Sequence, residues 1–299
     1  MKYIFWTVLF LAAAARSQAG EAPVALGSAA KFGVLAGATV TSTGETKVTG
    51  DLGVGPGGAV TGFPPGIVNG TIHASDPVAA QAEADLTLAF NDAAGRTTAP
   101  ATVAGNLGGL TLTPGLYKST SSLAISSGDL TLDAQGDANA VFLFQMASTL
   151  TTTAGRKVIL AGGARAANIY WQVGTSATLG TDSVLKGNIL ADQSITLNTR
   201  AALEGRALAR IGAVALDANT ITVPATLLAA PSFGPMRPPI SGAASLVITN
   251  TPGFMLSLQS SEDLMTWTTF ATPTPSASPS TFTDPNASAA KRFYRAFYP

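Results

Sequence analysis

The chain has 299 residues, of which 46% are apolar and only 11% are charged, and its 17 basic side chains balance its 17 acidic ones. The absence of cysteine excludes a disulfide framework, a thiolate metal site and a Cys nucleophile. The single histidine, His73, argues against a His-cluster metal site or a Ser-His triad. The neutral charge balance argues against nucleic acid or an anionic membrane as the partner.

Residues 1–19 have the pattern of a secretory signal. Lys2 supplies the positive charge, Ile4 to Ala15 form an apolar stretch too short to span a bilayer, and Ser17-Gln18-Ala19 offers small residues for cleavage. Cleavage there leaves Gly20 as the mature N-terminus. The alternative is an N-terminal membrane anchor, which the break in the apolar run disfavours. We therefore expect a secreted protein with no membrane insertion after the signal is removed.

One amphipathic helix is predicted between Ser75 and Gly95. Ser75 is a suitable N-cap, Asp76 and Pro77 suit the first turn, and Gly95 stands where a C′ glycine belongs. Apolar residues recur between them at helical spacing: Val78, Ala82, Leu86, Ala89, Phe90 and Ala93. Because the sequence predicts strands in the rest of this region, we expect the helix to lie against a strand-rich body.

The strand-rich body repeats with a period of about 18 residues. The columns with this spacing are Leu179, Leu197 and Leu216; Leu185, Leu203 and Ile221; Gly187 and Gly205; and Leu190 and Leu208. Three short strands between turns need about this length, so the period predicts a triangular β-solenoid whose coils stack and share one core. The alternative is a β-sandwich with accidental spacing.

Composition changes near Pro224. Residues 224–240 are Pro-rich and predict a semi-rigid linker, whereas residues 241–299 regain aromatic residues and alternate apolar with polar positions. We therefore divide the chain into a signal (1–19), a solenoid (20–223), a linker (224–240) and a small β module (241–299). The module resembles the β-sandwich tails of exported bacterial proteins in Ser260 to Trp267 and Arg292 to Ala296, and we assign it no chemistry.

Patterns that would indicate an enzyme are weak. Gly53 to Gly58 matches G-x-G-x-x-G, but Pro56 and the following Pro-rich run forbid the helix that a dinucleotide site requires. The acidic residues are spaced as turn residues or occur singly: Asp129, Asp133, Asp137, Asp182, Asp192 and Asp217. We expect no enzyme activity, no metal and no cofactor, and keep a carbohydrate-active β-helix enzyme as a weaker alternative. His73 reads as a hydrogen-bonded structural residue.

An outward face of small residues follows from strand alternation. If Leu179, Leu197 and Leu216 point inward, their neighbours Thr178, Thr196 and Ala215 point outward. Aligning Leu150 and Ile125 with the same inward column adds Thr149 and Ala124. The outward positions two residues later are Ser126, Thr151, Gly180, Asn198 and Asp217, and those two residues earlier are Ser122, Ala147, Ser176, Ser194 and Ala213. A purely structural interpretation is that Thr and small residues suit crowded sheets. A functional interpretation is that these residues form a flat grid that orders water.

Residues 26 to 224 resemble the large microbial ice-binding, or antifreeze, protein family. The stretches that carry the resemblance are Phe32 to Gly37, Gly50 to Val54, Val60 to Gly66, Ala79 to Leu86, Leu112 to Tyr117, Leu132 to Asp137, Val141 to Gln145 and Gly205 to Ala209. The resemblance implies an irregular β-solenoid with one long helix alongside. It also implies that the N-terminal strand joins the last coils, so that Ala38 and Val40 border the flat face, and that ice binds there.

The expected ice-binding residues are Ala38, Val40, Ser126, Thr149, Thr151, Ser176, Thr178, Thr181, Ser194, Thr196, Thr199, Ala213 and Ala215. Some family members repeat T-A/G-x-T/N on this face, a pattern that Thr175 to Thr178 and Thr199 to Ala202 follow only approximately. Arg200 and Asp217 place charges near the face, and we expect such charges to weaken ice binding.

We expect a monomeric, secreted protein whose partner is the ice crystal surface and which slows ice growth and recrystallisation. Its C-terminal module is a candidate for association with the cell surface. The alternative from another class is an adhesin or matrix protein that uses the solenoid as a stalk.

Overall fold

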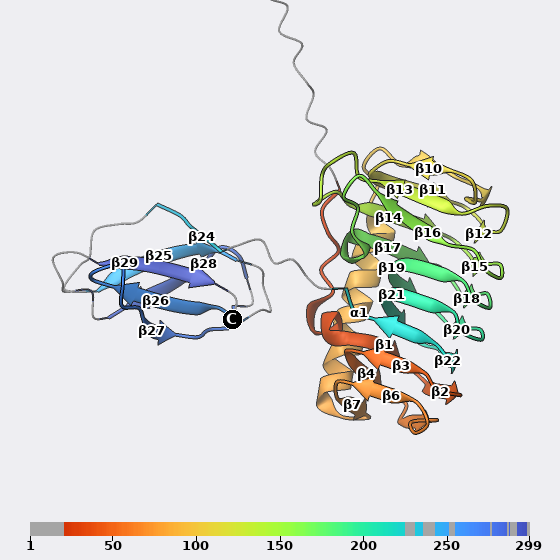
Figure 1. The fold of residues 1–299 in the computed structure, drawn as a ribbon, viewed down its shortest axis with the longest axis horizontal. Helices are drawn as coiled ribbons and strands as arrows, with labels where there is room; N and C mark the ends of the chain where they lie inside the picture. The colour runs from red at the N-terminus through yellow and green to blue at the C-terminus, as the bar shows by residue number, and fades with distance from the viewer. Residues whose placement is uncertain are drawn as a thin grey trace, which may run out of the picture.

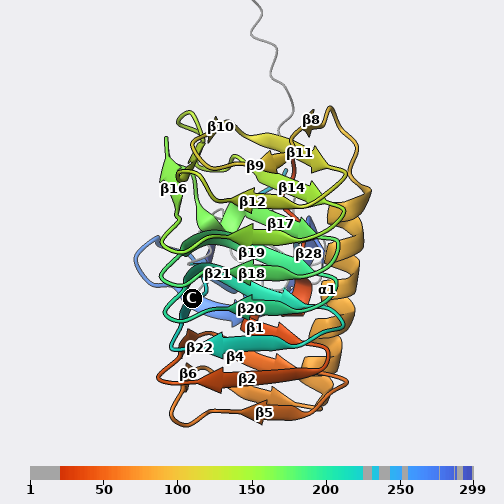
Figure 2. The same cartoon turned by 90° about the vertical axis from the view of Figure 1, so that its right-hand side faces the viewer.

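A parallel β-solenoid forms the main body of the structure, a computed structural model that describes residues 21–224, 231–235, 243–250, 255–275, 277–285, 287 and 292–297 (Figure 1). The signal expected over residues 1–19 lies outside the described residues. Three faces of parallel strands surround a triangular interior, and one helix lies along one of them (Figures 1 and 2). The predicted fold class, a mostly β solenoid with one helix alongside, is confirmed.

The first face lies beneath the helix. Its strands, in spatial order, are β8 (Ala101–Thr102), β11 (Gly115–Ser119), β14 (Phe142–Met146), β17 (Ile169–Val173), β19 (Val184–Ala191), β21 (Ala202–Ala209), β1 (Phe32–Ala36), β4 (Asp51–Val54) and β7 (Ile72–Ala74). The two eight-residue strands, β19 and β21, are long enough to continue onto the next face.

The second face begins with a small sheet and continues through the first halves of β19 and β21. Its strands are β10 (Thr111–Leu112), β13 (Leu130–Asp133) and β16 (Val158–Ala161), and beyond β21 come β23 (Thr220–Thr222), β3 (Lys47–Thr49) and β6 (Ile67–Asn69). β19 and β21 turn the corner at Gly187 (φ 113°) and Gly205 (φ 156°). A Cβ on Gly205 would lie 1.8 Å from the Gly187 carbonyl oxygen, so this corner of stacked coils requires glycine. This explains the glycine column in the 18-residue repeat.

The third face is a separate eight-stranded sheet (Figure 2). Its strands, in spatial order, are β9 (Gly105–Asn106), β12 (Leu123–Ile125), β15 (Leu150–Thr152), β18 (Ala177–Leu179), β20 (Ile195–Leu197), β22 (Val214–Asp217), β2 (Thr39–Thr43) and β5 (Ala59–Thr61). Six of these strands show strict alternation, with buried side chains facing the interior and partly exposed ones facing outward: β12, β18, β20, β22, β15 and β2.

The order of coils in space differs from their order along the chain. β1 pairs with β21 (Val34 beside Ala207), and β2 pairs with β22 (Val40 beside Val214). The N-terminal coils therefore extend the end of the solenoid that the chain reaches last, as the resemblance implied. The helix α1 (Pro77–Gly95), about 28 Å long, carries the chain from β7 at one end of the solenoid back toward β8 at the other.

The helix begins one residue later than the sequence predicts. Its N-cap is Asp76, whose carboxylate accepts the Ala79 N–H at 2.8 Å, while Ser75 stands before it in a left-handed conformation (φ 53°). Gly95 is the last helical residue instead of C′. Five of the six residues expected on the buried face are buried, but Val78 is 46% exposed, which makes that assignment wrong. Ala79 takes its place because it lies against Gly55.

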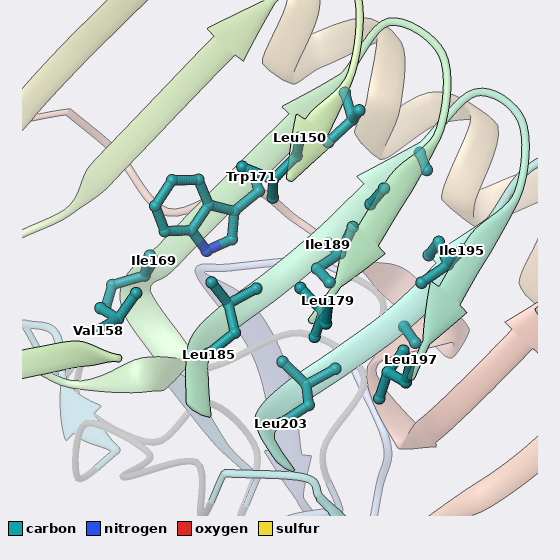
Figure 3. Close-up of a cluster of buried hydrophobic side chains, with 14 of the residues drawn as sticks. Leu150, Val158, Ile169, Trp171, Leu179, Leu185, Ile189, Ile195, Leu197 and Leu203 are labelled. Carbon is teal, nitrogen blue, oxygen red and sulfur yellow. The ribbon is translucent and has the colours of Figure 1, made fainter. Parts of the chain in front are cut away.

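Two apolar clusters hold the solenoid together. Inside it, Tyr117, Phe144 and Trp171 stand in register on β11, β14 and β17 and stack with ring centroids 5.1 and 4.2 Å apart. Leu, Ile and Val side chains from all three faces belong to the same cluster. Figure 3 shows several of them near Trp171. The second cluster joins Leu86 and its helical neighbours to the outward leucines of the first face and to the short 3₁₀ helix Gly27–Lys31. A second 3₁₀ turn, Ala166–Asn168, precedes β17.

The C-terminal module consists of two antiparallel three-stranded sheets. One contains β24 (Ser232–Phe233), β25 (Ala244–Thr249) and β28 (Ser280–Asp284), and the other contains β27 (Thr268–Ala271), β26 (Ser257–Ser261) and β29 (Phe293–Phe297). They share a core of Leu246, Ile248, Leu256 and Leu258. β24 lies inside the stretch expected to be a linker, because its backbone completes the edge of the first sheet.

Candidate functional site

The eight-stranded sheet places one outward residue of each strand in a single row. Paired residues in this central column are Asn106, Ala124, Thr151, Thr178, Thr196, Ala215, Thr41 and Thr61. Neighbouring positions are about 4.8 Å apart across strands. Among the described residues no group forms a hydrogen bond with the hydroxyls of Thr151, Thr178 or Thr196. These hydroxyls are therefore available to solvent.

A second outward column flanks the first, and several of its hydroxyls form hydrogen bonds to neighbouring coils. It consists of Ser122, Thr149, Ser176, Ser194, Ala213, Thr39 and Ala59. The Thr149 hydroxyl donates to Ser122 Oγ at 2.8 Å, and Ser194 Oγ accepts the Ala213 N–H at 3.2 Å. Hydroxyls that bond to the next coil lose rotational freedom, so this edge of the face is held rigid by its own side chains.

The N-terminal strand supplies outward residues that differ from those expected. Val40 is fully buried and points into the interior beside Val214, so its assignment to the face is wrong. Thr39, Thr41 and Thr43 point outward instead. Ala38 is exposed, but it lies in the turn before β2, where its N–H donates to the Gly212 carbonyl. The alternation of threonine with Val40 and Ser42 is the sequence signal that identifies these three residues.

Comparisons with known proteins agree with this architecture. The family model of ice-binding-like proteins matches residues 34–222. The chain belongs to this family. It is 50% identical over 198 residues to the ice-binding protein of Nostoc sp. (strain HG1), covering 66% of this chain and 73% of the relative. It is 38% identical over 215 residues to the ice-binding protein of Flavobacterium frigoris (strain PS1), covering 67% and 76%.

Solved structures of the ice-binding family match the same part of the chain. A crystal structure of an ice binding protein from an Antarctic Biological Consortium is 60% identical, with a TM-score of 0.68 over 69% of this chain and 93% of that chain. The ice-binding protein of the Antarctic ascomycete Antarctomyces psychrotrophicus is 42% identical, with a TM-score of 0.65 over 68% and 100%. The similarity therefore covers almost the whole length of both solved chains.

In this ice-binding family member, the coil around Leu150 is displaced by two residues from the expected alignment. Leu150 lies beside Ala177, and Thr152 lies beside Leu179. Thr151 is therefore in the central column, and Thr149 is in the flanking one. The inward position that pairs with Leu179 holds Thr152, a polar residue, and the apolar pattern of the sequence therefore points to Leu150 instead. The Thr152 hydroxyl donates to Ser183 Oγ at 3.0 Å and accepts the Gly180 N–H at 2.9 Å, so it is buried without an unpaired polar atom.

The other predicted residues lie on the face or at its edges. Ser176, Ser194 and Ala213 are in the flanking column, and Thr178, Thr196 and Ala215 are in the central one. Ser126 lies beyond β12, where its hydroxyl donates to Asn106 Oδ1 at 3.0 Å. Thr181 and Thr199 follow β18 and β20 at the corner of the coil and are half-buried.

The two charges near the face are both paired within the family member's own coils. Asp217 accepts hydrogen bonds from the hydroxyls of Thr43 (2.9 Å) and Thr199, and these bonds lower its pKa. Arg200, exposed at the corner, forms two bonds to the Asp182 carboxylate, at 2.7 and 2.8 Å. Each charge is therefore fixed in place. The Asp217 carboxylate lies between Thr43 and Thr199 and is hydrogen-bonded to both.

Three further acidic residues of the solenoid accept hydrogen bonds from backbone N–H groups. Asp133 and Asp137 accept the backbone N–H groups of Gln135 and Asn139, each at 2.8 Å, within their own turns, as the sequence predicts. Asp129 instead accepts the Lys157 N–H of the neighbouring coil at 2.9 Å. His73 Nδ1 lies 2.7 Å from Asp76 Oδ2, beside the helix N-cap, which confirms the structural interpretation. In the described part of the chain, no helix is long and apolar enough to cross a membrane.

Proposed function

We propose that this chain adsorbs to ice through the eight-stranded sheet, outside the cell, and thereby slows ice growth and recrystallisation. The observation that carries the proposal is the pair of outward columns, in which Thr, Ser and Ala repeat in register across the strands without one bulky side chain between β12 and β2. Membership of a family whose named relatives are ice-binding proteins supports it. The targeting pattern over residues 1–19 supports secretion.

The face orders water by a combination of apolar and polar contacts. Threonine methyl groups and alanine side chains limit where water molecules can lie, while the unpaired hydroxyls of the central column anchor them. Because the hydroxyls of Ser122, Thr149, Ser176 and Ser194 already bond to neighbouring coils, little of their side-chain entropy is lost when the surface meets a crystal. Many weak contacts then form together over a rigid plane. We further propose that the chain is a monomer, with the solenoid over residues 20–223 and a C-terminal module over residues 241–299 that also takes β24 from the connecting stretch 224–240.

The substitution Thr196→Tyr tests the site. Thr196 is in the middle of the central column, between Thr178 and Ala215, and its inward neighbours are unchanged by the substitution. We expect stability to change by under about 1 kcal/mol, as surface substitutions usually do. The ring projects above the plane, so water can no longer lie in one layer, and thermal hysteresis should fall to a small fraction of the parent value.

The matched control is Thr268→Tyr on β27 of the C-terminal module, where Thr268 is exposed. This variant should keep the parental hysteresis, ice shaping and melting temperature. A Thr196→Tyr protein with parental melting and parental hysteresis would move the ice site to another surface. A parent protein that leaves ice crystals unshaped would instead favour the solenoid as the stalk of an adhesin.

A further inference from the structure

The outer face of one sheet in the C-terminal module presents a cation between aromatic rings. On β29, Phe293, Arg295 and Phe297 are exposed on one side, whereas Tyr294 and Ala296 pack against the module core. The Arg295 guanidinium carbon lies 4.3 Å from the ring centroid of Trp267 and 5.7 Å from that of Phe297. Arg295 is therefore an exposed cation within reach of two aromatic rings.

Hydrogen bonds fix this cation in position. Arg295 Nε donates to Gln259 Oε1 at 2.7 Å, and Gln259 Nε2 donates to Thr269 Oγ1 at 2.8 Å. The chain Arg295–Gln259–Thr269 crosses all three strands of the sheet, because Gln259 is paired with both other residues. A guanidinium held in this way loses little entropy when it binds a partner.

The charge of Arg295 is not neutralised within the described part of the chain. The other described arginine of the module, Arg292, lies 2.7 Å from Asp284 and 3.6 Å from Glu262. The Asp263 carboxylate accepts the N–H groups of Met265 and Thr266. Among the described residues, no acidic side chain forms an ion pair with Arg295, and its two terminal nitrogens have no hydrogen-bond acceptor.

We propose that this face binds a carboxylate-bearing polysaccharide. The free edge of the guanidinium matches a carboxylate in two parallel hydrogen bonds. The flanking rings offer apolar surfaces for the C–H faces of sugar rings, and the Gln259 and Thr269 side chains offer partners for sugar hydroxyls. An exposed sheet face that carries these groups side by side suits an extended polymer. A single cation is too little for an anionic membrane, which is recognised by clusters of basic residues.

Polysaccharide binding is separate from ice adsorption, and it would explain how the C-terminal module associates with the cell surface. The two activities use different residues on different sheets, so each can be removed without the other. Failure of polysaccharide binding would leave the ice proposal intact, and loss of ice activity in Thr196→Tyr would leave polysaccharide binding intact.

Binding of the full mature chain to alginate, a polymer of uronic acids, tests the proposal, with neutral dextran as the reference polymer. We expect binding to alginate that weakens with added salt, and little binding to dextran. Arg295→Gln should lower the affinity for alginate about tenfold or more. Arg295→Lys keeps the charge without the paired donors and should have an intermediate affinity. Thermal hysteresis should equal that of the parent in both variants, and an unchanged thermal transition of the C-terminal module verifies that the module itself is folded.

The matched control is Lys157→Gln, which removes an exposed positive charge from the solenoid and should bind alginate as the parent does. Equal binding of alginate by the parent and by Arg295→Gln would overturn the proposal, as would equal binding of alginate and dextran by the parent. Preferential binding to vesicles of anionic lipid would overturn it in favour of a membrane. Dimerisation that Arg295→Gln abolishes would overturn it in favour of a second copy of the chain.

Discussion

Glu83 lies on the buried side of α1, where both carboxylate oxygens are without a hydrogen-bond donor among the described residues and the residue is 9% exposed. Burial raises its pKa from 4.5 to about 8, although the charge of Arg210 partly opposes the shift. Arg210 is itself paired with Asp192. Between these two pH values the folded protein keeps a proton that the unfolded chain releases, so stability falls as pH rises through this window and is level above it.

Replacing Glu83 with glutamine should remove this pH dependence. At pH 4 the parent and Glu83→Gln should have similar melting temperatures, because the carboxyl is protonated in both states. At pH 9 the variant should be more stable by up to about 5 kcal/mol. Thermal unfolding at several pH values measures the difference, and parallel pH profiles for the two proteins would show that Glu83 ionises at its ordinary pKa.

Some residues of the face could be predicted from the sequence pattern, and others could not. The repeat of inward leucines predicted the central column at Thr178, Thr196 and Ala215, because apolar residues are buried in those coils. It could not place the coil of Thr152, since a buried threonine whose hydroxyl is paired to another coil looks like a surface residue in the sequence. Val40 was misplaced because a position taken from a resemblance carries no information about which side of the strand it occupies.

At the scale of elements, α1 serves as both connection and support. Its apolar face covers the outward leucines of the first sheet, and Gln145 on β14 donates to the carbonyls of Ala93 and Arg96 at the C-terminal end of the helix, at 2.6 and 2.8 Å. The sequence predicted this helix to within a residue at each end, because capping residues and apolar spacing are local signals. The pairing of β1 with β21 is non-local and was accessible only through the family resemblance.

Leu86→Ala tests the supporting role of the helix. Leu86 is fully buried between the helix and the sheet, so its truncation should cost about 2–5 kcal/mol of stability through lost burial and a cavity. Hysteresis per folded molecule should stay at the parental level, because the helix covers the first face and the proposed ice-binding columns lie on the third. Chemical denaturation gives the stability, and hysteresis is compared at a temperature where both proteins are folded. Unchanged stability would contradict the burial of this side chain.

At the scale of the whole molecule, the solenoid and the module are built on separate cores. The two clusters of the solenoid contain residues 24–221 only, whereas the module cluster contains Leu246, Ile248, Leu256 and Leu258. In the described part of the chain, no strand of the module pairs with the solenoid. The change in composition near Pro224 predicted two units, but it could not reveal that Ser232 and Phe233 add a strand to the second, since two residues give no periodic pattern.

A mature chain that ends at Pro224 should therefore fold and keep its ice activity. Its last strand, β23, is already paired on both sides, with β21 and with β3, so the truncation opens no sheet edge in the solenoid. Few contacts cross a boundary of this kind, and the two units should unfold independently. We expect the truncated protein to have the hysteresis of the full chain at equal molar concentration, a cooperative thermal transition, and no binding to alginate. Aggregation of the truncated protein would show that the module completes the fold, and loss of ice shaping with an intact transition would place part of the ice site on the module.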